Sequence, residues 1–400
     1  MVQREVDNFE SLIHPVTRRE FIDLYWGKST LVLHRHDHDY FRDLFSLADL
    51  DSCLMTAANR SSKILQIIPA PDSGRSGMLT SVAGLSKDRL YEAYLSGDTI
   101  RLIGVEKVWP PFGRLAAGLQ EALDMNIGFN LFLTPPGSQG FPAHVDVLDS
   151  LIIQVAGSKQ WHIWEPIYER PMDSPRSFQH ITKMRWTEEE LKLRHKPLLE
   201  AGDLIYLPRG FFHKAVAVDE FSLHLTISFH PLNWVDFFGR ALELAALEDV
   251  ELRQDLPPGF IGDPEAQQNM SIVFARLLAR FSEKLSFDAA LGSLVEEHVG
   301  ARPFPADGHF SVLAGMREIG LDSVVERRLG LACLVESSGG TTAIIFGPKR
   351  VQGPKEIFST LEFIRDNRKF RICDLPGSTS LDGKLTLVRR LVRDGLLRPV

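Results

Sequence analysis

The distribution of hydrophobic and polar residues changes character near residue 232. Before that point, from about residue 128, short apolar runs are separated by proline and glycine turns, as in a sheet of many strands. From Phe221 to His230, apolar and polar residues alternate strictly. Because neighbouring residues of a strand face opposite sides, one face of this strand suits a core. The other face is small and polar, which suits the lining of a pocket inside a barrel.

Helical spacing replaces this pattern after Pro231. The segment 234–248 is rich in Ala and Leu, and Asp263-Pro264 has the form of an N-cap followed by a first-turn proline. Large apolar residues then recur at helical intervals, at Phe274, Leu277, Leu278, Phe281 and Leu285. With Trp234, Phe237, Phe238 and Leu242 they form more apolar surface than a peripheral helix usually leaves uncovered. We therefore expect residues 233–300 to form a helical dimerisation domain and the protein to be a homodimer.

The rest of the chain supplies an insertion and a further domain. Residues 165–197 are polar and interrupt the strands, on the side where a substrate would approach. The last hundred residues hold two helical stretches, 355–367 and 381–393, and Gly395 is placed to end the second helix. This order fits a winged-helix domain over residues 301–400.

A candidate metal site stands out among the polar residues. His144 and Asp146 form a His-x-Asp pair on an expected strand, where residues two apart face the same side and can reach one metal. His213 follows in the turn after Leu207-Pro208. Two histidines and one carboxylate are the facial triad of non-haem Fe(II) oxygenases, which leaves coordination positions for a co-substrate and O2.

Lys159 lies fifteen residues after His144 in the next apolar-rich segment. It would supply a fixed cation for the far carboxylate of a dicarboxylate such as 2-oxoglutarate. Asn130 shares one face of its expected strand with Phe132 and Thr134, and that face could line the same pocket.

Four segments together resemble the cupin-type JmjC oxygenases of the ribosomal oxygenase family. They are Asn130 to Phe141, His144 to Asp146, Gln154 to Trp161, and Gly202 to Gly210 with its Gly-Asp-x-x-Tyr-x-Pro-x-Gly pattern. The likeness extends over nearly the whole chain. It implies an α+β fold, with a double-stranded β-helix (cupin, JmjC jelly-roll) catalytic domain over residues 1–232. A helical dimerisation module and a C-terminal winged helix would follow this domain.

The resemblance also implies a chemistry. Family members are 2-oxoglutarate- and Fe(II)-dependent hydroxylases of arginine or histidine in ribosomal proteins. By this likeness the iron ligands are His144, Asp146 and His213, and Lys159 holds the distal carboxylate of 2-oxoglutarate. The candidate cofactor contacts beside it are Asn130, Thr226 and Ser228. Phe132 departs from the family, which usually has a tyrosine there, and this puts one cofactor hydrogen bond in doubt.

Other histidines offer competing interpretations. His34, His36 and His38 form a second candidate ligand cluster, but a solvated turn is the simpler interpretation because no matching ligand segment lies near them in sequence. His162 alternates with Trp161 and should lie outside the barrel. For His224, on the polar strand face, a structural role and a role in supporting the site or contacting substrate stay equally open.

Composition limits the compartment and the partners. The 400 residues are 44% hydrophobic and 24% charged, with no apolar run long enough for a membrane span and no apolar signal segment at the start, so we expect a cytoplasmic protein. Residues 301–400 carry 16 Lys and Arg against 11 Asp and Glu, although the whole chain has a net charge of −7. The expected helix with Lys384, Arg389, Arg390 and Arg393 could read nucleic acid, but a solvated basic face is the interpretation we favour.

Two alternatives to a protein hydroxylase remain at this stage. The same chemistry could act on a small molecule or a ribosomally made peptide. A non-catalytic cupin could instead sense a metal or ligand and be coupled to a nucleic-acid-binding winged helix. Lys159 separates the two classes, because a sensor needs no cation for a dicarboxylate.

Overall fold

The computed structural model describes residues 6–58, 64–71, 80–81, 87–302 and 308–400. The chain divides into two compact units, residues 1–230 and 231–400. The expectation that no signal segment is present rests partly on residues 1–5, which lie outside the described residues. None of the helices in the described part is both long and apolar enough to cross a membrane.

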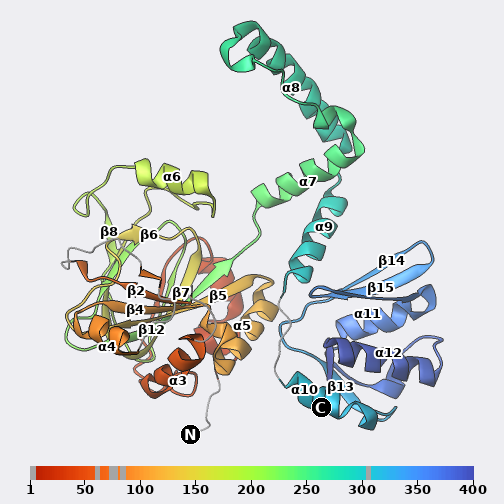
Figure 1. The fold of residues 1–400 in the computed structure, drawn as a ribbon, viewed down its shortest axis with the longest axis horizontal. Coiled ribbons are helices and arrows are strands. Elements are labelled where there is room, and N and C mark those ends of the chain that lie inside the picture. Colours follow the sequence, from red (N-terminus) through yellow and green to blue (C-terminus); the bar gives the residue numbers. More distant parts are fainter. Residues whose placement is uncertain (1–5, 59–63, 72–79, 82–86, 303–307) are drawn as a thin grey trace. The chain divides into compact units, whose positions relative to one another are not determined.

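The first unit combines antiparallel strands with helices (Figure 1). Its strands are β1 (Leu31–Leu33), β2 (Leu65–Ile68), β3 (Thr80–Ser81), β4 (Thr99–Ile103), β5 (Asn126–Thr134), β6 (His144–Val145), β7 (Asp149–Trp164), β8 (Leu193–His195), β9 (Leu198–Glu200), β10 (Leu204–Leu207), β11 (Phe212–Val216) and β12 (Ser222–His230). Its α-helices are α1 (Phe9–Ile13), α2 (Arg18–Glu20), α3 (Leu47–Ala58), α4 (Lys87–Leu95), α5 (Pro110–Leu123) and α6 (Pro175–Lys183).

Strand β7 pairs with strands of two sheets. The main sheet has the order β1-β10-β7-β12-β5-β4-β2-β3, and β7 also pairs with β8, β9 and β11. The change of partners occurs at Gly157, which has φ +64° and lies so close to β12 that a Cβ atom would meet the Phe221 carbonyl oxygen at 1.9 Å. Only glycine fits this close approach, so Gly157 allows one strand to serve two sheets.

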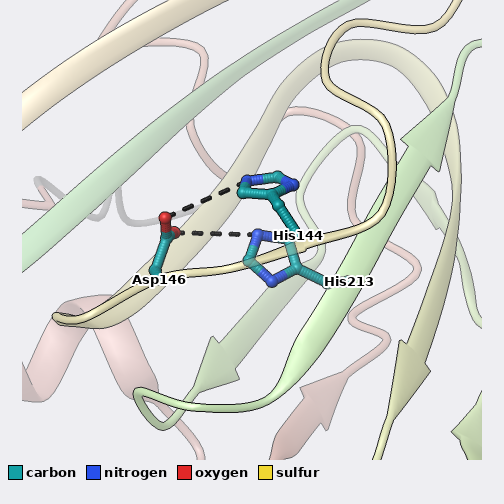
Figure 2. A group of neighbouring side chains, drawn as sticks. All are labelled: His144, Asp146 and His213. Atoms are coloured by element: carbon teal, nitrogen blue, oxygen red, sulfur yellow. Dashed lines mark ion pairs between the residues drawn. The ribbon is translucent and has the colours of Figure 1, made fainter. Parts of the chain in front are cut away.

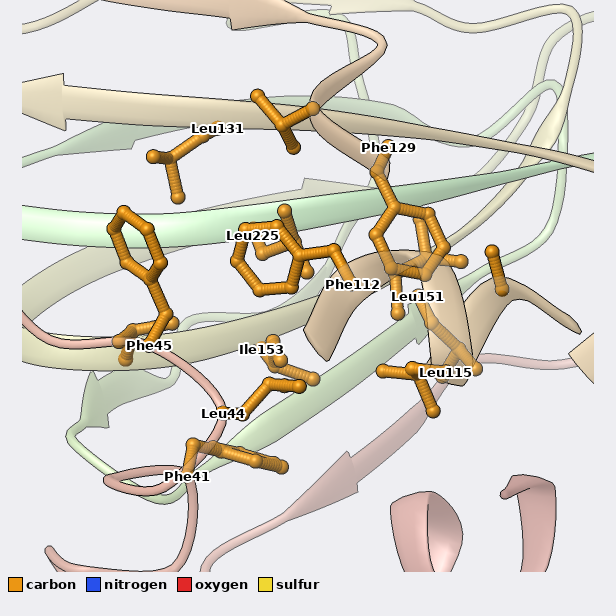
Figure 3. Close-up of a cluster of buried hydrophobic side chains, with 14 of the residues drawn as sticks. Phe41, Leu44, Phe45, Phe112, Leu115, Phe129, Leu131, Leu151, Ile153 and Leu225 are labelled. Carbon is orange, nitrogen blue, oxygen red and sulfur yellow. The ribbon is translucent and has the colours of Figure 1, made fainter. Parts of the chain in front are cut away.

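The alternation predicted for the last strand is confirmed, and it separates the core from the pocket. Leu223, Leu225, Ile227 and Phe229 of β12 are buried in the main hydrophobic core. Figure 3 shows Leu225 of this row beside Leu131 and Phe129 of β5 and Phe112 of α5. Phe112 stacks on Phe45 at 5.0 Å and meets Phe129 edge-on at 5.9 Å. Helix α5 therefore covers the apolar face of the sheet and leaves the polar face for the site.

The second unit begins with three long helices. They are α7 (Trp234–Glu248), α8 (Pro264–Lys284) and α9 (Phe287–Gly300), and α7 has the bounds expected from the sequence. Asp263 caps α8 as predicted, because its side chain accepts hydrogen bonds from the Glu265 and Ala266 amides. Helix α7 packs on α9 through a small apolar cluster, whereas α8 has no buried residue. Phe281 of α8 packs against this cluster, but Phe274 is 66% exposed and Leu278 is 54% exposed, so part of the apolar stripe of α8 is uncovered in a single chain.

The rest of this unit forms a separate core around two small sheets. It contains α10 (His309–Ala314), α11 (Phe358–Asp366) and α12 (Leu381–Asp394), the sheet β17-β13-β18 and the sheet β14-β15-β16. The strands are β13 (Val324–Arg327), β14 (Leu334–Ser338), β15 (Thr341–Phe346), β16 (Lys349–Pro354), β17 (Lys369–Arg371) and β18 (Leu397–Pro399). Gly395 ends α12 in the left-handed region, as predicted. The winged helix, and the division of the second unit into 233–300 and 301–400, stay predictions.

The basic side chains of α12 have internal partners. Lys384 is buried and donates a hydrogen bond to the Leu375 carbonyl oxygen. Arg389 donates to the Ile319 carbonyl oxygen at 2.6 Å. Arg390 and Arg393 both pair with Asp394. Lys384 and Arg389 therefore stabilise the unit's own fold.

Candidate functional site

The first unit brings His144, Asp146 and His213 together (Figure 2). His144 on β6 and His213 on β11 are direct partners in an antiparallel ladder. Asp146 comes immediately after β6 rather than within it. One ligand atom from each of the three side chains can be chosen so that all lie within 4.8 Å of one another. This spacing suits donors around a single metal ion.

The ring orientations of the two histidines favour metal binding. His144 Nδ1 lies 2.8 Å from the Pro142 carbonyl oxygen, and His213 Nδ1 lies 3.2 Å from that of Phe211. These contacts make Nδ1 the protonated nitrogen and leave the lone pair on Nε2. Both Nε2 atoms face the Asp146 carboxylate, at 3.9 Å from His144 and 3.7 Å from His213.

The segment from Gly202 to Gly210, which precedes His213, helps to hold the triad in place. The Gly210 amide donates to the Asp146 carbonyl oxygen at 3.0 Å, which ties one ligand loop to the other. Gly210 has φ +95°, and a Cβ there would approach the Tyr168 carbonyl oxygen to 2.7 Å. The Tyr206 hydroxyl donates to buried Asp149 at 2.9 Å. The Gly-Asp-x-x-Tyr-x-Pro-x-Gly segment therefore positions the ligands.

Burial keeps one ligand in the form that binds metals. Burial, with a smaller effect from nearby His144, lowers the pKa of His213 to about 4 in the metal-free protein. His213 is therefore a neutral imidazole near neutral pH, as metal coordination requires.

A cavity of about 320 Å³ extends from the triad into the barrel. It is lined by every residue predicted for the site, namely His144, Asp146, His213, Lys159, Asn130, Thr226 and Ser228. Because these residues lie on β5, β7, β11 and β12 and on or just after β6, the two sheets form the pocket together.

Lys159 marks the buried end of this cavity. Its side chain is 3% exposed, and its Nζ atom donates to the Thr134 hydroxyl at 2.9 Å. None of the ion pairs among the described residues involves Lys159, so its ammonium group has no carboxylate partner there. Burial lowers the pKa of Lys159 to about 7. A buried cation without a counter-charge is costly, and an anionic ligand would relieve that cost.

The competing histidines have other contacts. His34 Nδ1 lies 2.8 Å from the carboxylate of Asp203, and the His34 side chain remains 42% exposed, which agrees with a solvated segment. Within the described ranges, only the His144, Asp146 and His213 group has the spacing of a metal site. His162 stacks on Trp164 at 5.9 Å and does not line the cavity.

Arg101 on β4 is a cavity residue that the sequence interpretation missed. Its guanidinium group lies 5.3 Å from the centre of the Phe132 ring and 5.9 Å from that of Phe141. Burial lowers the pKa of Arg101, and the charge of Asp146 raises it by a smaller amount. The alternation of Thr99 and Arg101 with apolar residues was the available signal for a strand with one polar face.

Comparisons with known proteins agree with this geometry. Residues 108–237 match the JmjC domain family. This segment is therefore similar in sequence to JmjC domains. Ribosomal oxygenase 1 of Gallus gallus is 31% identical over 266 residues, which are 65% of this chain and 43% of the relative. Ribosomal oxygenase 1 of Homo sapiens is 33% identical over 271 residues, covering 66% of this chain and 41% of the relative.

A third relative is the "Bifunctional lysine-specific demethylase and histidyl-hydroxylase NO66" of Aedes aegypti. It is 31% identical over 258 residues, which are 63% of this chain and 40% of the relative. The chain therefore matches less than half of the length of these relatives. The expected resemblance to JmjC ribosomal oxygenases is confirmed.

A solved structure supports the fold around the JmjC domain. The Escherichia coli ribosomal oxygenase YcfD, in a structure with cobalt and 2-oxoglutarate, aligns with a TM-score of 0.57 and 18% identity. The alignment covers 96% of this chain and 98% of YcfD. The predicted double-stranded β-helix of the JmjC and cupin type is thereby confirmed.

Proposed function

We propose that this chain is a 2-oxoglutarate- and Fe(II)-dependent oxygenase that hydroxylates a histidine or arginine side chain of a ribosomal protein. One observation carries the proposal. A metal-ligand triad and a buried lysine without a carboxylate partner line the same cavity. A metal-binding sensor would not need the buried cation, whereas a dicarboxylate co-substrate does.

The residues present fit both cofactors. Fe(II) would be held by His144, Asp146 and His213, because two imidazoles and one carboxylate form the facial triad that this ion uses in oxygenases. The orientation of both Nε2 atoms toward Asp146 supports this assignment. Lys159 would pair with the distal carboxylate of 2-oxoglutarate, and Asn130, Thr226 and Ser228 are available along the cavity. Bound iron and 2-oxoglutarate would together supply the oxidising chemistry, while the chain binds, orients and excludes water.

The substrate proposal rests on the relatives and on access to the metal end. Relatives named ribosomal oxygenase 1 and histidyl-hydroxylase suggest a protein substrate. The side chains of His144 and Asp146 are 35% and 46% exposed, so a substrate residue can approach the triad from solvent. The half-buried pair of Lys214, which lines the cavity, and Glu188 of the polar insertion supports a role of the insertion near the site.

A turnover assay tests this function. The protein would be incubated with Fe(II), 2-oxoglutarate and ribosomal proteins, and succinate would be measured in air and under argon. We expect succinate in air, more of it with ribosomal proteins present, and none from His144→Ala. Equal succinate under argon, or none under any condition with metal-loaded protein, would contradict the proposal.

We also propose that the protein acts as a cytoplasmic homodimer built on residues 233–300. The exposed stripe of α8 supports this, since Phe274 and Leu278 would be covered by the same surface of a second copy. Leu278→Asp would place a charge in that surface. Light scattering should then show monomers, while the control Gln268→Asp on the same helix should leave the dimer intact. A 45.0 kDa species for the wild type at micromolar concentration would contradict the dimer.

A further inference from the structure

His224 lies at the buried end of the cavity and is not explained by the triad or by Lys159 alone. It is on β12, directly opposite Phe132 on β5. Its ring stacks on Phe132 with centroids 4.8 Å apart and planes inclined by 7°. The Trp161 ring meets it nearly at a right angle, at 5.7 Å. Two aromatic side chains therefore fix the plane of the imidazole.

The polar atoms of this imidazole are incompletely satisfied. His224 is 4% exposed, lines the cavity, and its Nδ1 atom is buried without a hydrogen-bond partner. A buried nitrogen without a partner costs folding free energy. Phe132 has no hydroxyl to offer and presents only its ring face. Because Nδ1 is sealed off from the cavity, a ligand there would meet His224 at the other ring nitrogen, Nε2.

The charge beside His224 indicates the kind of ligand. Burial, and after it the neighbouring Lys159 charge, holds the pKa of His224 well below its usual range. His224 is therefore a neutral imidazole, with one N–H donor and one acceptor nitrogen. A cationic ligand would be repelled by Lys159, whereas an anion would be attracted to it and could accept the imidazole N–H. A carboxylate has enough acceptor positions for several donors.

We propose that His224 is a second donor, beside Lys159, for the distal carboxylate of a bound 2-oxo dicarboxylic acid. This inference rests on the proposed function. Lys159 supplies the charge, and His224, held by Phe132 and Trp161, supplies direction. By donating to the distal carboxylate, His224 would favour ligands that carry a carboxylate at the buried end of the cavity.

Direct binding to the zinc-loaded full-length protein tests the proposal without turnover. Calorimetry would compare 2-oxoglutarate with 2-oxopentanoate, which has a methyl group in place of the distal carboxylate. His224→Leu should weaken 2-oxoglutarate binding by about 10- to 100-fold, since a hydrogen bond to a charged group is lost. Its affinity for 2-oxopentanoate should not change. His224→Gln retains an N–H donor and should recover part of the affinity.

A measurement on the wild type covers the case in which the variants fold poorly. In the zinc-loaded protein, the His224 ring nitrogen signals should move when 2-oxoglutarate is added and stay in place with 2-oxopentanoate. Equal 2-oxoglutarate affinity for wild type and His224→Leu, or unmoved ring signals on saturation, would overturn the role of His224. A wild type that does not prefer 2-oxoglutarate over 2-oxopentanoate would instead contradict the proposed function itself, so the two failures are distinguishable.

Discussion

The two ends of the cavity differ in how far they are open to solvent. At the metal end, the side chains of His144 and Asp146 are 35% and 46% exposed. At the other end, Lys159 is 3% and His224 is 4% exposed. The comparison suggests a division of tasks. A varied, bulky protein substrate needs an open approach, whereas a small co-substrate of constant shape gains from a closed, desolvated end in which charges interact more strongly.

The strand arrangement explains this difference. His144 and Asp146 lie at and just after the short strand β6. Lys159 and His224 lie on β7 and β12, which are long strands with partners on both sides. A side chain on such a strand is enclosed by the opposite sheet, so burial of the distal end follows from the topology.

The largest effect is expected at the open end. His144→Ala or His213→Ala removes one of three protein ligands, and turnover should fall by more than about 100-fold, because even the residues that orient ligands contribute 10- to 100-fold. Metal content after dialysis should fall as well. His162→Ala is the matched control, since this histidine does not line the cavity. Full turnover in either triad variant would contradict the ligand assignment.

Lys159→Ala should impair 2-oxoglutarate binding at the buried end of the cavity without affecting metal binding at the open end. Losing one side of a buried charge pair costs about 2–5 kcal/mol, so the 2-oxoglutarate concentration for half-maximal rate should rise on the order of 30- to several-thousand-fold. Metal content should stay at the wild-type level. Lys214→Ala is the control, because Lys214 lines the cavity but pairs with Glu188. An unchanged requirement for 2-oxoglutarate would mean that another cation lining the cavity, Arg101 or Lys214, holds the carboxylate.

The distal end should also respond to pH. With a pKa of about 7 in the empty cavity, Lys159 is largely neutral above pH 7 and must take up a proton before it can pair with a carboxylate. His224, the titratable group beside it, remains neutral because its own pKa is lowered. Affinity for 2-oxoglutarate should therefore fall about tenfold per pH unit above pH 7. Calorimetry in buffers of different ionisation enthalpy should show proton uptake, and a flat affinity up to pH 9 would contradict this account.

The smallest effect is expected from Thr134→Val, which removes the hydroxyl that holds Lys159 Nζ. Affinity for 2-oxoglutarate should weaken by about tenfold or less, as for the loss of one hydrogen bond, while metal content stays unchanged. Thr99→Val is a close control, because Thr99 contacts the same hydroxyl at 3.1 Å but not the lysine. Loss of metal in Thr134→Val would show that the two ends are not independent.

The sequence allowed much of the site to be predicted where the information is local. Strand alternation placed His224, Thr226 and Ser228 on the polar face of β12, and the structure has them lining the cavity. The spacing of the sequence motifs predicted the metal-binding triad and Lys159 as site residues. Helix caps at Asp263 and Gly395 were also readable, because they depend on neighbouring residues.

Contacts between residues far apart in the chain could not be predicted from the sequence. The tie between Lys159 and Thr134 joins residues 25 apart in sequence, and it depends on β5 and β7 meeting across the barrel. The pairing of His34 with Asp203 spans 169 positions. Arg101 enters the cavity only because β4 pairs with β5 in a register that no local pattern encodes.

Intact-mass measurement of ribosomal proteins would show whether this chain hydroxylates one of them. Cells that express the wild-type chain would be compared with cells that lack it and with cells that express His213→Ala. We expect one ribosomal protein to be heavier by a single oxygen atom, on a histidine or arginine, only where the wild-type chain is present. Identical masses in all three samples, despite folded and metal-loaded protein, would contradict this expectation.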